Sequence, residues 1–350
     1  MSTIATKIWT TPRLRAWLAA LALLIVAYGL VPYFGTTYLL EAILTPFLAL
    51  SLAAVGLNLL TGYAGQLSLG TAAFMATGAF AAYNFNLRIH GLPLTVSLLL
   101  AGACAAAIGI LFGLPSLRLR GFYLAVSTLA AQFFVQWVLT KFGWFSNNNP
   151  SGVIDAPPLS LFGFSFEGPL GRYLFTLTVV VILTAVAQRI VSTQTGHDFI
   201  AIRDNELAAR VIGIPVLRTK LLAFGLSSFI VGVAGVLWAF AYLRTVEPAG
   251  FNLDRSFQIV FIIIIGGLAS IRGAFFGAAL IVVFPVILSC LGSWLFGGLF
   301  DSGILDMSQR IILGLLIIIF LIVEPNGLVA LWDRLSQSLS SITASKRNHP

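Results

Sequence analysis

Apolar residues occur along this chain in long runs that contain no Asp, Glu, Lys or Arg and that are separated by short polar breaks. Ten runs cover residues 16–31, 42–60, 66–87, 93–117, 122–140, 173–188, 221–243, 256–268, 274–295 and 311–323. A membrane-spanning helix needs about 20 mostly apolar residues. The pattern predicts an all-α polytopic membrane protein with about ten transmembrane helices, within a range of about eight to ten.

The run 256–268 is too short to cross a bilayer as a regular helix. Its 13 residues extend about 20 Å, against a hydrocarbon core of about 30 Å. Gly266 and Gly267 lie near its end, and Gly273 and Gly277 follow. We predict a broken or re-entrant helix whose free backbone groups face protein or water.

Basic residues predict the orientation of the spans. When the runs are threaded from a cytoplasmic N-terminus, 14 of the 20 Lys and Arg fall inside, as the positive-inside rule requires. We therefore expect a cytoplasmic N-terminus 1–15, one transmembrane domain 16–331 and a cytoplasmic tail 332–350. Within that domain, residues 141–172 form a periplasmic loop and residues 192–220 a cytoplasmic loop. No A-x-A-like cleavage site follows the first run, which is interpreted as a retained span.

Composition excludes several functional classes. Hydrophobic residues make up 59% of the chain and charged residues only 9%, whereas a soluble domain has about 25% charged residues. The net charge of +8 is spread over the polar breaks, which favours membrane orientation over nucleic-acid binding. The histidines and the cysteines do not have metal-ligand spacing, so we expect no metal and no bound cofactor.

Energy for transport is predicted to come from another subunit. The runs contain no ionisable residue that could carry a coupled proton. The chain has no G-x-x-x-x-G-K-[ST] motif to bind ATP and no nucleophile motif of the G-x-S-x-G kind. The chain is therefore expected not to be an enzyme, and to form a path whose ATPase is separate.

Residues 56–70, GLNLLTGYAGQLSLG, combine four glycines with uncharged polar side chains between two apolar runs. We interpret this segment as buried backbone at a helix break that lines the path of a polar solute. A tight helix hairpin whose polar groups are satisfied internally is the alternative. The candidate path residues are Asn58, Thr61, Gly62, Gly65, Gln66, Ser68, Gly266 and Gly267.

Small residues recur at helical spacing in two runs. They are Gly102, Ala106, Gly109 and Gly113 in one run and Gly225, Ser228, Gly232 and Gly235 in another. Small side chains let membrane helices approach closely, so both stripes are interpreted as packing faces.

Within the inside loop, residues 204–213 have the pattern of a two-turn helix. Asp204 or Asn205 is the predicted N-cap, and Gly213 ends the helix before Pro215. So short a helix needs a partner surface, either its own domain and the headgroups or a cytoplasmic subunit. The candidate residues for coupling to an ATPase are Arg203, Asp204, Asn205, Glu206, Ala208, Ala209 and Gly213. A bulky charged residue at Ala209 is expected to crowd the docking face.

Five segments together resemble the inner-membrane permeases of bacterial branched-chain amino acid ABC importers, of the LivM type. They are residues 56–70, 120–128 (RGFYLAVST), 196–224 (GHDFIAIRDNELAARVIGIPVLRTKLLAF), 265–277 (IGGLASIRGAFFG) and 324–328 (EPNGL). The resemblance implies a complex with a sister permease of the LivH type, two ABC ATPases and a periplasmic binding protein, in the inner membrane. The inside loop loosely resembles the EAA loop of importer permeases, although Leu207 stands where that pattern places Glu.

The substrate implied by the resemblance is a branched-chain or related amino acid. Related permeases carry urea or short-chain amides, and these stay open as alternatives. From a different class, an ATP-independent channel or facilitator would use the same uncharged path.

Overall fold

The computed structural model describes residues 22–89, 91–115, 122–149, 152–161, 164–296, 311, 312, 314, 315, 318, 322, 327–331 and 334. The predicted N-terminus 1–15 lies outside the described residues, as do most of the predicted last span 311–323 and most of the tail 332–350.

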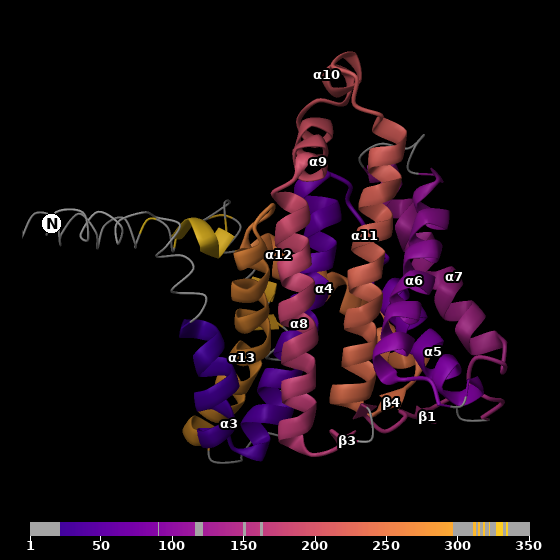
Figure 1. The fold of residues 1–350 in the computed structure, drawn as a ribbon. Helices are drawn as coiled ribbons and strands as arrows, with labels where there is room; N and C mark the ends of the chain where they lie inside the picture. The colour runs from indigo at the N-terminus through magenta and orange to yellow at the C-terminus, as the bar shows by residue number, and fades with distance from the viewer. Residues whose placement is uncertain are drawn as a thin grey trace, which may run out of the picture.

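Helices dominate the described part of the chain (Figure 1). The α-helices are α3 Val31–Phe34, α4 Thr45–Asn58, α5 Thr71–Arg88, α6 Leu94–Gly113, α7 Phe122–Lys141, α8 Pro169–Val191, α9 Gln194–Asp204, α10 Glu206–Val211, α11 Val216–Leu237, α12 Leu253–Gly266 and α13 Ile271–Phe296. π-Helical turns at Val26–Leu30, Leu39–Leu44, Leu59–Tyr63 and Trp238–Leu243 and a 3₁₀ turn at Pro248–Phe251 extend several of them. Among the described residues, seven continuous helical segments are long and apolar enough to cross a membrane. The prediction of an all-α polytopic membrane protein is confirmed.

Four short strands complete the fold of the described residues. β1 Ile154–Asp155 pairs antiparallel with β4 Thr245–Val246, and Ile154 lies opposite Val246. β2 Ser160–Leu161 pairs antiparallel with β3 Phe164–Ser165. These strands lie at one end of the helices, which we call the strand end, and α9 and α10 extend beyond the opposite end (Figure 1).

α11 is the central helix and packs against α4, α5 and α6. A Cβ on Gly109 would lie 2.0 Å from Ser228 Oγ, and one on Gly232 would lie 2.3 Å from the Cβ of Ala105. About one turn further along α11, a Cβ on Gly235 would lie 2.1 Å from Met75 O. The two small-residue stripes are therefore packing faces, as predicted, because only glycine permits these backbone separations.

The structure corrects two of the predicted boundaries. The run 66–87 is helical only from Thr71, because residues 64–70 form an irregular segment before α5. The short run 256–268 belongs to a longer helical segment, Pro248–Gly266, which extends past the charged residues Asp254 and Arg255. Hydropathy places a boundary at the first charge, whereas backbone hydrogen bonding continues through it.

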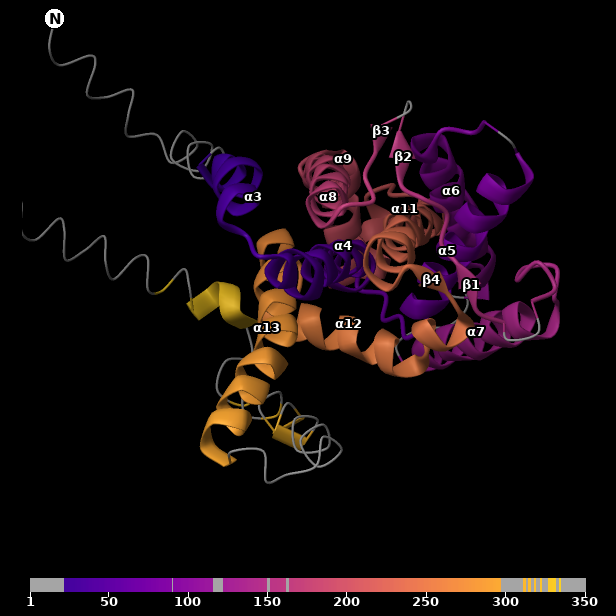
Figure 2. The same ribbon diagram turned by 90° about the horizontal axis from the view of Figure 1, so that it is seen from below.

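The predicted helix break after Gly266 is present. Residues 267–270 separate α12 from α13, with φ of 120° at Gly267 and 56° at Ala269. Seen from the strand end, α12 and α13 run in different directions on one side of α4 (Figure 2). The loop 267–270 packs on the end of α4 through Asn58.

Candidate functional site

Asn58 joins two helix breaks that are far apart in the sequence. Its side chain is fully buried at the end of α4. The amide Nδ2 donates to Ser270 O at 2.8 Å, and Oδ1 accepts from Ala269 N at 2.9 Å. One side chain therefore binds a backbone donor and a backbone acceptor of the loop 267–270, of which Ser270 O also accepts from Ala274 N at 3.3 Å.

Gly62 packs against this pair of hydrogen bonds. A Cβ at Gly62 would be 2.0 Å from Asn58 Oδ1 and 2.4 Å from Ala269 N. Both distances are far below van der Waals contact, so the junction between α4 and the loop 267–270 needs glycine at this position.

Arg203 of α9 contacts the same helical turn, Leu59–Tyr63. Its Nη1 donates to Gly62 O at 3.0 Å. Its side-chain stem covers Gly65, where a Cβ would lie 2.6 Å from Arg203 Cγ and where φ is +68°. The structure thus brings together a candidate coupling residue, Arg203, and two candidate path residues, Gly62 and Gly65.

Residues 64–70 continue from this turn to the start of α5. Thr61 Oγ1 donates to Gln66 O at 3.1 Å, and Gly70 N donates to Ser68 Oγ at 3.4 Å. The Gln66 side chain is 4% exposed, and its Oε1 and Nε2 have no hydrogen-bond partner within the described part of the chain. Asn58 and Thr61 are thus engaged in internal hydrogen bonds, as in the hairpin alternative, whereas the Gln66 amide is buried and unpaired.

The N-terminus of α5 is held by buried side chains from other helices. Ala72 N donates to Ser256 Oγ at 2.9 Å, and Ala73 N donates to Gln132 Oε1 at 2.6 Å. Just before the helix, Leu69 N donates to Thr128 Oγ1 at 2.9 Å. Ser256 and Gln132 bind N–H groups in the first turn of α5, where a helix leaves them free, and Thr128 binds the segment that leads into it. Sequence reasoning missed them, because single polar residues within apolar runs carry no sign of the distant groups they bind.

Gly266 and Gly267 allow three segments to meet closely. A Cβ on Gly266 would lie 2.0 Å from Gly273 O. A Cβ on Gly327 would lie 2.6 Å from the Cα of Gly267. Their contacts are therefore with backbone, and both glycines act here as packing residues between α12, α13 and the segment near Gly327.

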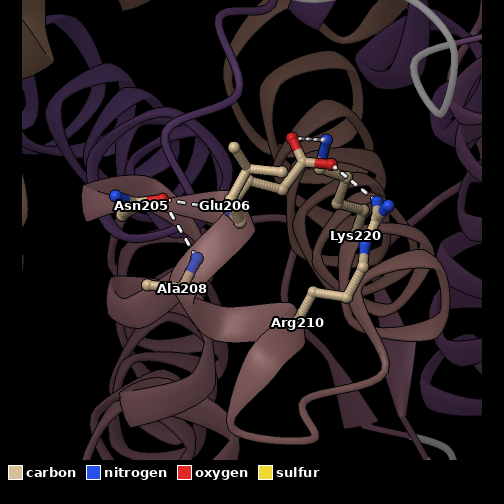
Figure 3. Close-up of polar contacts among 6 residues, drawn as sticks. Asn205, Glu206, Ala208, Arg210 and Lys220 are labelled. Atoms are coloured by element: carbon tan, nitrogen blue, oxygen red, sulfur yellow. Dashed lines mark hydrogen bonds and ion pairs between the residues drawn. The ribbon is translucent and has the colours of Figure 1, made fainter.

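The candidate coupling segment forms the predicted short helix, α10 (Figure 3). Asn205 is its N-cap, and its Oδ1 accepts from Leu207 N at 3.0 Å and from Ala208 N at 3.1 Å. Gly213 follows the helix with φ of +91°, a backbone conformation that glycine adopts without steric cost.

Glu206 fixes α10 to α11. Its Oε2 accepts from Lys220 Nζ at 3.0 Å, and its Oε1 accepts from Arg210 Nη2 at 3.4 Å (Figure 3). The Lys220 side chain is only 9% exposed and that of Glu206 17%, so their contact lies largely out of solvent. Asp204 instead pairs with its neighbour Arg203 at 2.9 Å.

Ala209 does not lie on an exposed face, and the expectation that it forms part of a docking surface is wrong. Its side chain is 1% exposed and packs with Ile202 and Val216. The helical repeat turns Ala209 toward the rest of the loop and turns Leu207, Val211 and Ile212 outward, where they are 63%, 87% and 71% exposed. The face of α10 that is free to meet a partner is this apolar one.

Comparison with known proteins gives the relatives of the chain. The family described as branched-chain amino acid transport system, permease component, matches residues 39–321. The LivM permease protein of the high-affinity branched-chain amino acid transport system of Escherichia coli K12 is 31% identical, over 91% of this chain and 76% of its own. The autoinducer 2 import permease LsrC of Enterobacter sp. 638 is 28% identical, over 85% and 87%. The ribose import permease RbsC of E. coli K12 is 27% identical, over 79% and 85%.

The matched region contains both the α4–α5 break and the α9–α10 segment. With its membrane-spanning helices, the chain is a multi-pass protein of the bacterial inner membrane. Separate subunits hydrolyse the ATP that drives transport, and a binding protein delivers the solute. The chain therefore belongs to the branched-chain amino acid permease family, as a permease subunit of a binding-protein-dependent ABC importer.

Proposed function

We propose that this permease carries branched-chain or related amino acids into the cell. The observation that carries the proposal is the family match together with the similarity to LivM over nine-tenths of the chain. The relatives named as ribose and autoinducer 2 permeases are less similar to this chain than LivM of E. coli is. Urea or a short-chain amide is the second candidate, since the path residues identified from the sequence are uncharged.

We propose the orientation that the basic residues favour, with α9 and α10 in the cytoplasm and the strand end in the periplasm. The partners are then a sister permease of the LivH type beside the helices, two ATPases at the α9–α10 end and a periplasmic binding protein at the strand end. The exposed apolar face of α10 supports this arrangement, because a contiguous apolar surface on a water-facing segment is typical of a protein interface.

Two polar contacts would transmit movement of α10 into the membrane domain. Glu206 and Lys220 join α10 to α11, the central helix. Arg203 joins α9 to Gly62, and Asn58 continues from the same turn to the loop 267–270. A displacement of the α9–α10 segment by an ATPase would therefore act on the α4–α5 break, on the α12–α13 break and on α11 together.

The experiment that tests the proposed function is uptake of radiolabelled L-leucine, ribose and urea by cells expressing the complete importer. L-leucine is expected to accumulate in an ATP-dependent manner, and uptake is expected to stop when the ATPase is inactivated. Collapse of the proton gradient at constant ATP should leave uptake unchanged, because ATP hydrolysis in the separate subunits supplies the energy. Accumulation of urea or ribose in place of leucine would refute the amino-acid assignment.

Charge on the exposed face of α10 is expected to separate the permease from its ATPase. In Val211→Asp, a carboxylate replaces an exposed side chain on the proposed docking face, and burying that charge in an apolar contact is costly. We expect the ATPase to be lost from the purified complex while permease expression stays normal. Ser192→Asp adds the same charge at an exposed position outside α10 and should keep the ATPase bound. Full retention of the ATPase by Val211→Asp would exclude this docking face.

Ala209→Glu has a different expected effect from Val211→Asp. It would place a carboxylate among Ile202 and Val216, both less than a tenth exposed. The α9–α10 segment itself would lose its packing, so this substitution does not test docking.

A further inference from the structure

Three charged residues from distant parts of the sequence meet at the strand end. Arg172 lies in the first turn of α8, Arg244 follows the π-helical turn Trp238–Leu243, and Glu41 lies in the turn Leu39–Leu44. Glu41 Oε1 accepts from Arg172 Nη2 at 2.6 Å and from Arg244 Nη2 at 2.8 Å. One carboxylate thus holds two guanidinium groups, which leaves this group of three with one net positive charge.

Both arginines line a cavity of about 490 Å³. Small-molecule sites commonly have volumes of about 300–1,000 Å³. Glu167 also lines the cavity, and the rest of its wall is mainly apolar, with Leu159, Phe240 and two prolines. The cavity therefore offers positive charge, a single carboxylate and an apolar surface within one small volume.

Arg172 is buried more deeply than a guanidinium normally is. Its side chain is 8% exposed, and its Nε has no hydrogen-bond partner among the described residues. A buried N–H of a charged group without an acceptor is costly. Arg244, by contrast, is 57% exposed and is held at φ of +61°, while its carbonyl accepts from Ala156 N at 2.9 Å. Both groups can still donate to a further acceptor, because each guanidinium carries five N–H donors.

We propose that this cavity is a subsite for a carboxylate-bearing solute, in which Arg244 and Arg172 bind the carboxylate. Guanidinium groups match the planar geometry of a carboxylate, and a charge-assisted hydrogen bond is stronger than a neutral one. Glu167 provides a partner for the ammonium group of an amino acid, and Phe240 and Leu159 provide contact for an aliphatic side chain. The inference deepens the proposed function and uses its orientation, which places the cavity on the periplasmic side.

Urea and ribose match the residues that line this cavity less well than an amino acid does. Neither carries a carboxylate to accept from the two arginines or an ammonium group to bind Glu167. An amino acid would use both signs of charge in the cavity as well as its apolar wall.

The test measures protection of a cysteine within the cavity, without transport and without the binding protein. Ala156, which lines the cavity and is only partly buried, is changed to cysteine in a chain in which Cys104 and Cys290 are replaced by alanine. Intact spheroplasts expressing the importer are treated with a membrane-impermeant maleimide in the presence of millimolar L-leucine or L-leucinamide. We expect leucine to slow labelling and leucinamide, which lacks the carboxylate, not to do so.

Arg244→Gln is expected to abolish protection by leucine. Arg88→Gln is the matched control, because Arg88 is also an arginine assigned to the periplasmic side, binding Trp144 O at 2.9 Å, but does not line the cavity. Arg172→Lys keeps the buried charge and loses the planar fork, so it should weaken protection in a chain that still folds.

Equal protection by leucinamide, protection that survives Arg244→Gln, or no protection by leucine at all would each overturn the proposal. Protection seen only after addition of the binding protein would assign the carboxylate to that protein and would also overturn it. The proposed function fails in a different measurement, ATP-driven uptake of leucine. Carboxylate-dependent protection without such uptake would leave the subsite standing and remove the proposed function.

Discussion

Gly62→Ala is expected to prevent assembly of a stable importer. The added methyl group would lie 2.0 Å from Asn58 Oδ1 and 2.4 Å from Ala269 N. Asn58 would have to leave the loop 267–270, so that its own buried amide and the backbone N–H of Ala269 lose their hydrogen bonds while the junction is overpacked. Together these effects cost about 3 kcal/mol or more. The measurement is the yield and the thermal unfolding temperature of the purified complex.

Gly29→Ala is the control for the Gly62 substitution. Gly29 lies in the helical turn Val26–Leu30, and a Cβ there would meet no atom within 4 Å. Its replacement should leave yield and unfolding temperature unchanged or slightly raised, because alanine restricts the unfolded chain more than glycine does. If Gly62→Ala matched Gly29→Ala in both measurements, the hydrogen bonds between Asn58 and the loop 267–270 would not be essential for assembly.

Arg203→Ala is expected to uncouple ATP hydrolysis from uptake. It removes the hydrogen bond from Arg203 Nη1 to Gly62 O and the side-chain stem that covers Gly65. A hydrogen bond to a charged group contributes about 1.5–3 kcal/mol, and about 1.4 kcal/mol corresponds to a factor of ten. The Arg203 side chain is 35% exposed, so solvent screening reduces this contribution to the lower end of the range. We therefore expect leucine uptake to fall by about tenfold while the ATPase stays bound and active.

Arg189→Ala provides the comparison for Arg203. Arg189 is exposed in the last turn of α8, and its removal should change neither uptake nor ATP hydrolysis. The unfolding temperature of Arg203→Ala separates coupling from stability, since a purely structural role would lower it together with subunit association. Wild-type uptake by Arg203→Ala would show that this contact transmits nothing.

The α9–α10 segment has one set of residues that contacts the membrane domain and another set that is exposed. Arg203, Ala209 and Glu206 contact the chain's own helices, whereas the apolar face of α10 is exposed. A segment that transmits force must be fixed to the domain that it moves and free to bind the subunit that moves it. The inward contacts belong to the first requirement and the apolar face to the second.

Local sequence determined the helical membrane fold, the approximate positions of the two helix breaks and the ends of α10. Each depends on neighbouring residues: the length of an apolar run, a cluster of glycines, an Asn cap and a glycine that adopts positive φ. The packing role of the small-residue stripes was also predictable, because glycine at helical spacing has few other uses in a membrane helix.

Tertiary structure alone decided which polar residues meet. Asn58 contacts residues more than 200 positions later, Ser256 and Gln132 hold the start of α5, and Glu41 joins Arg172 to Arg244. An apolar run gives no information on which side of the helix its few polar residues lie or which helix packs there. That choice depends on close packing of whole helix faces, to which every small residue along the interface contributes, and so it exists only once the helices are assembled.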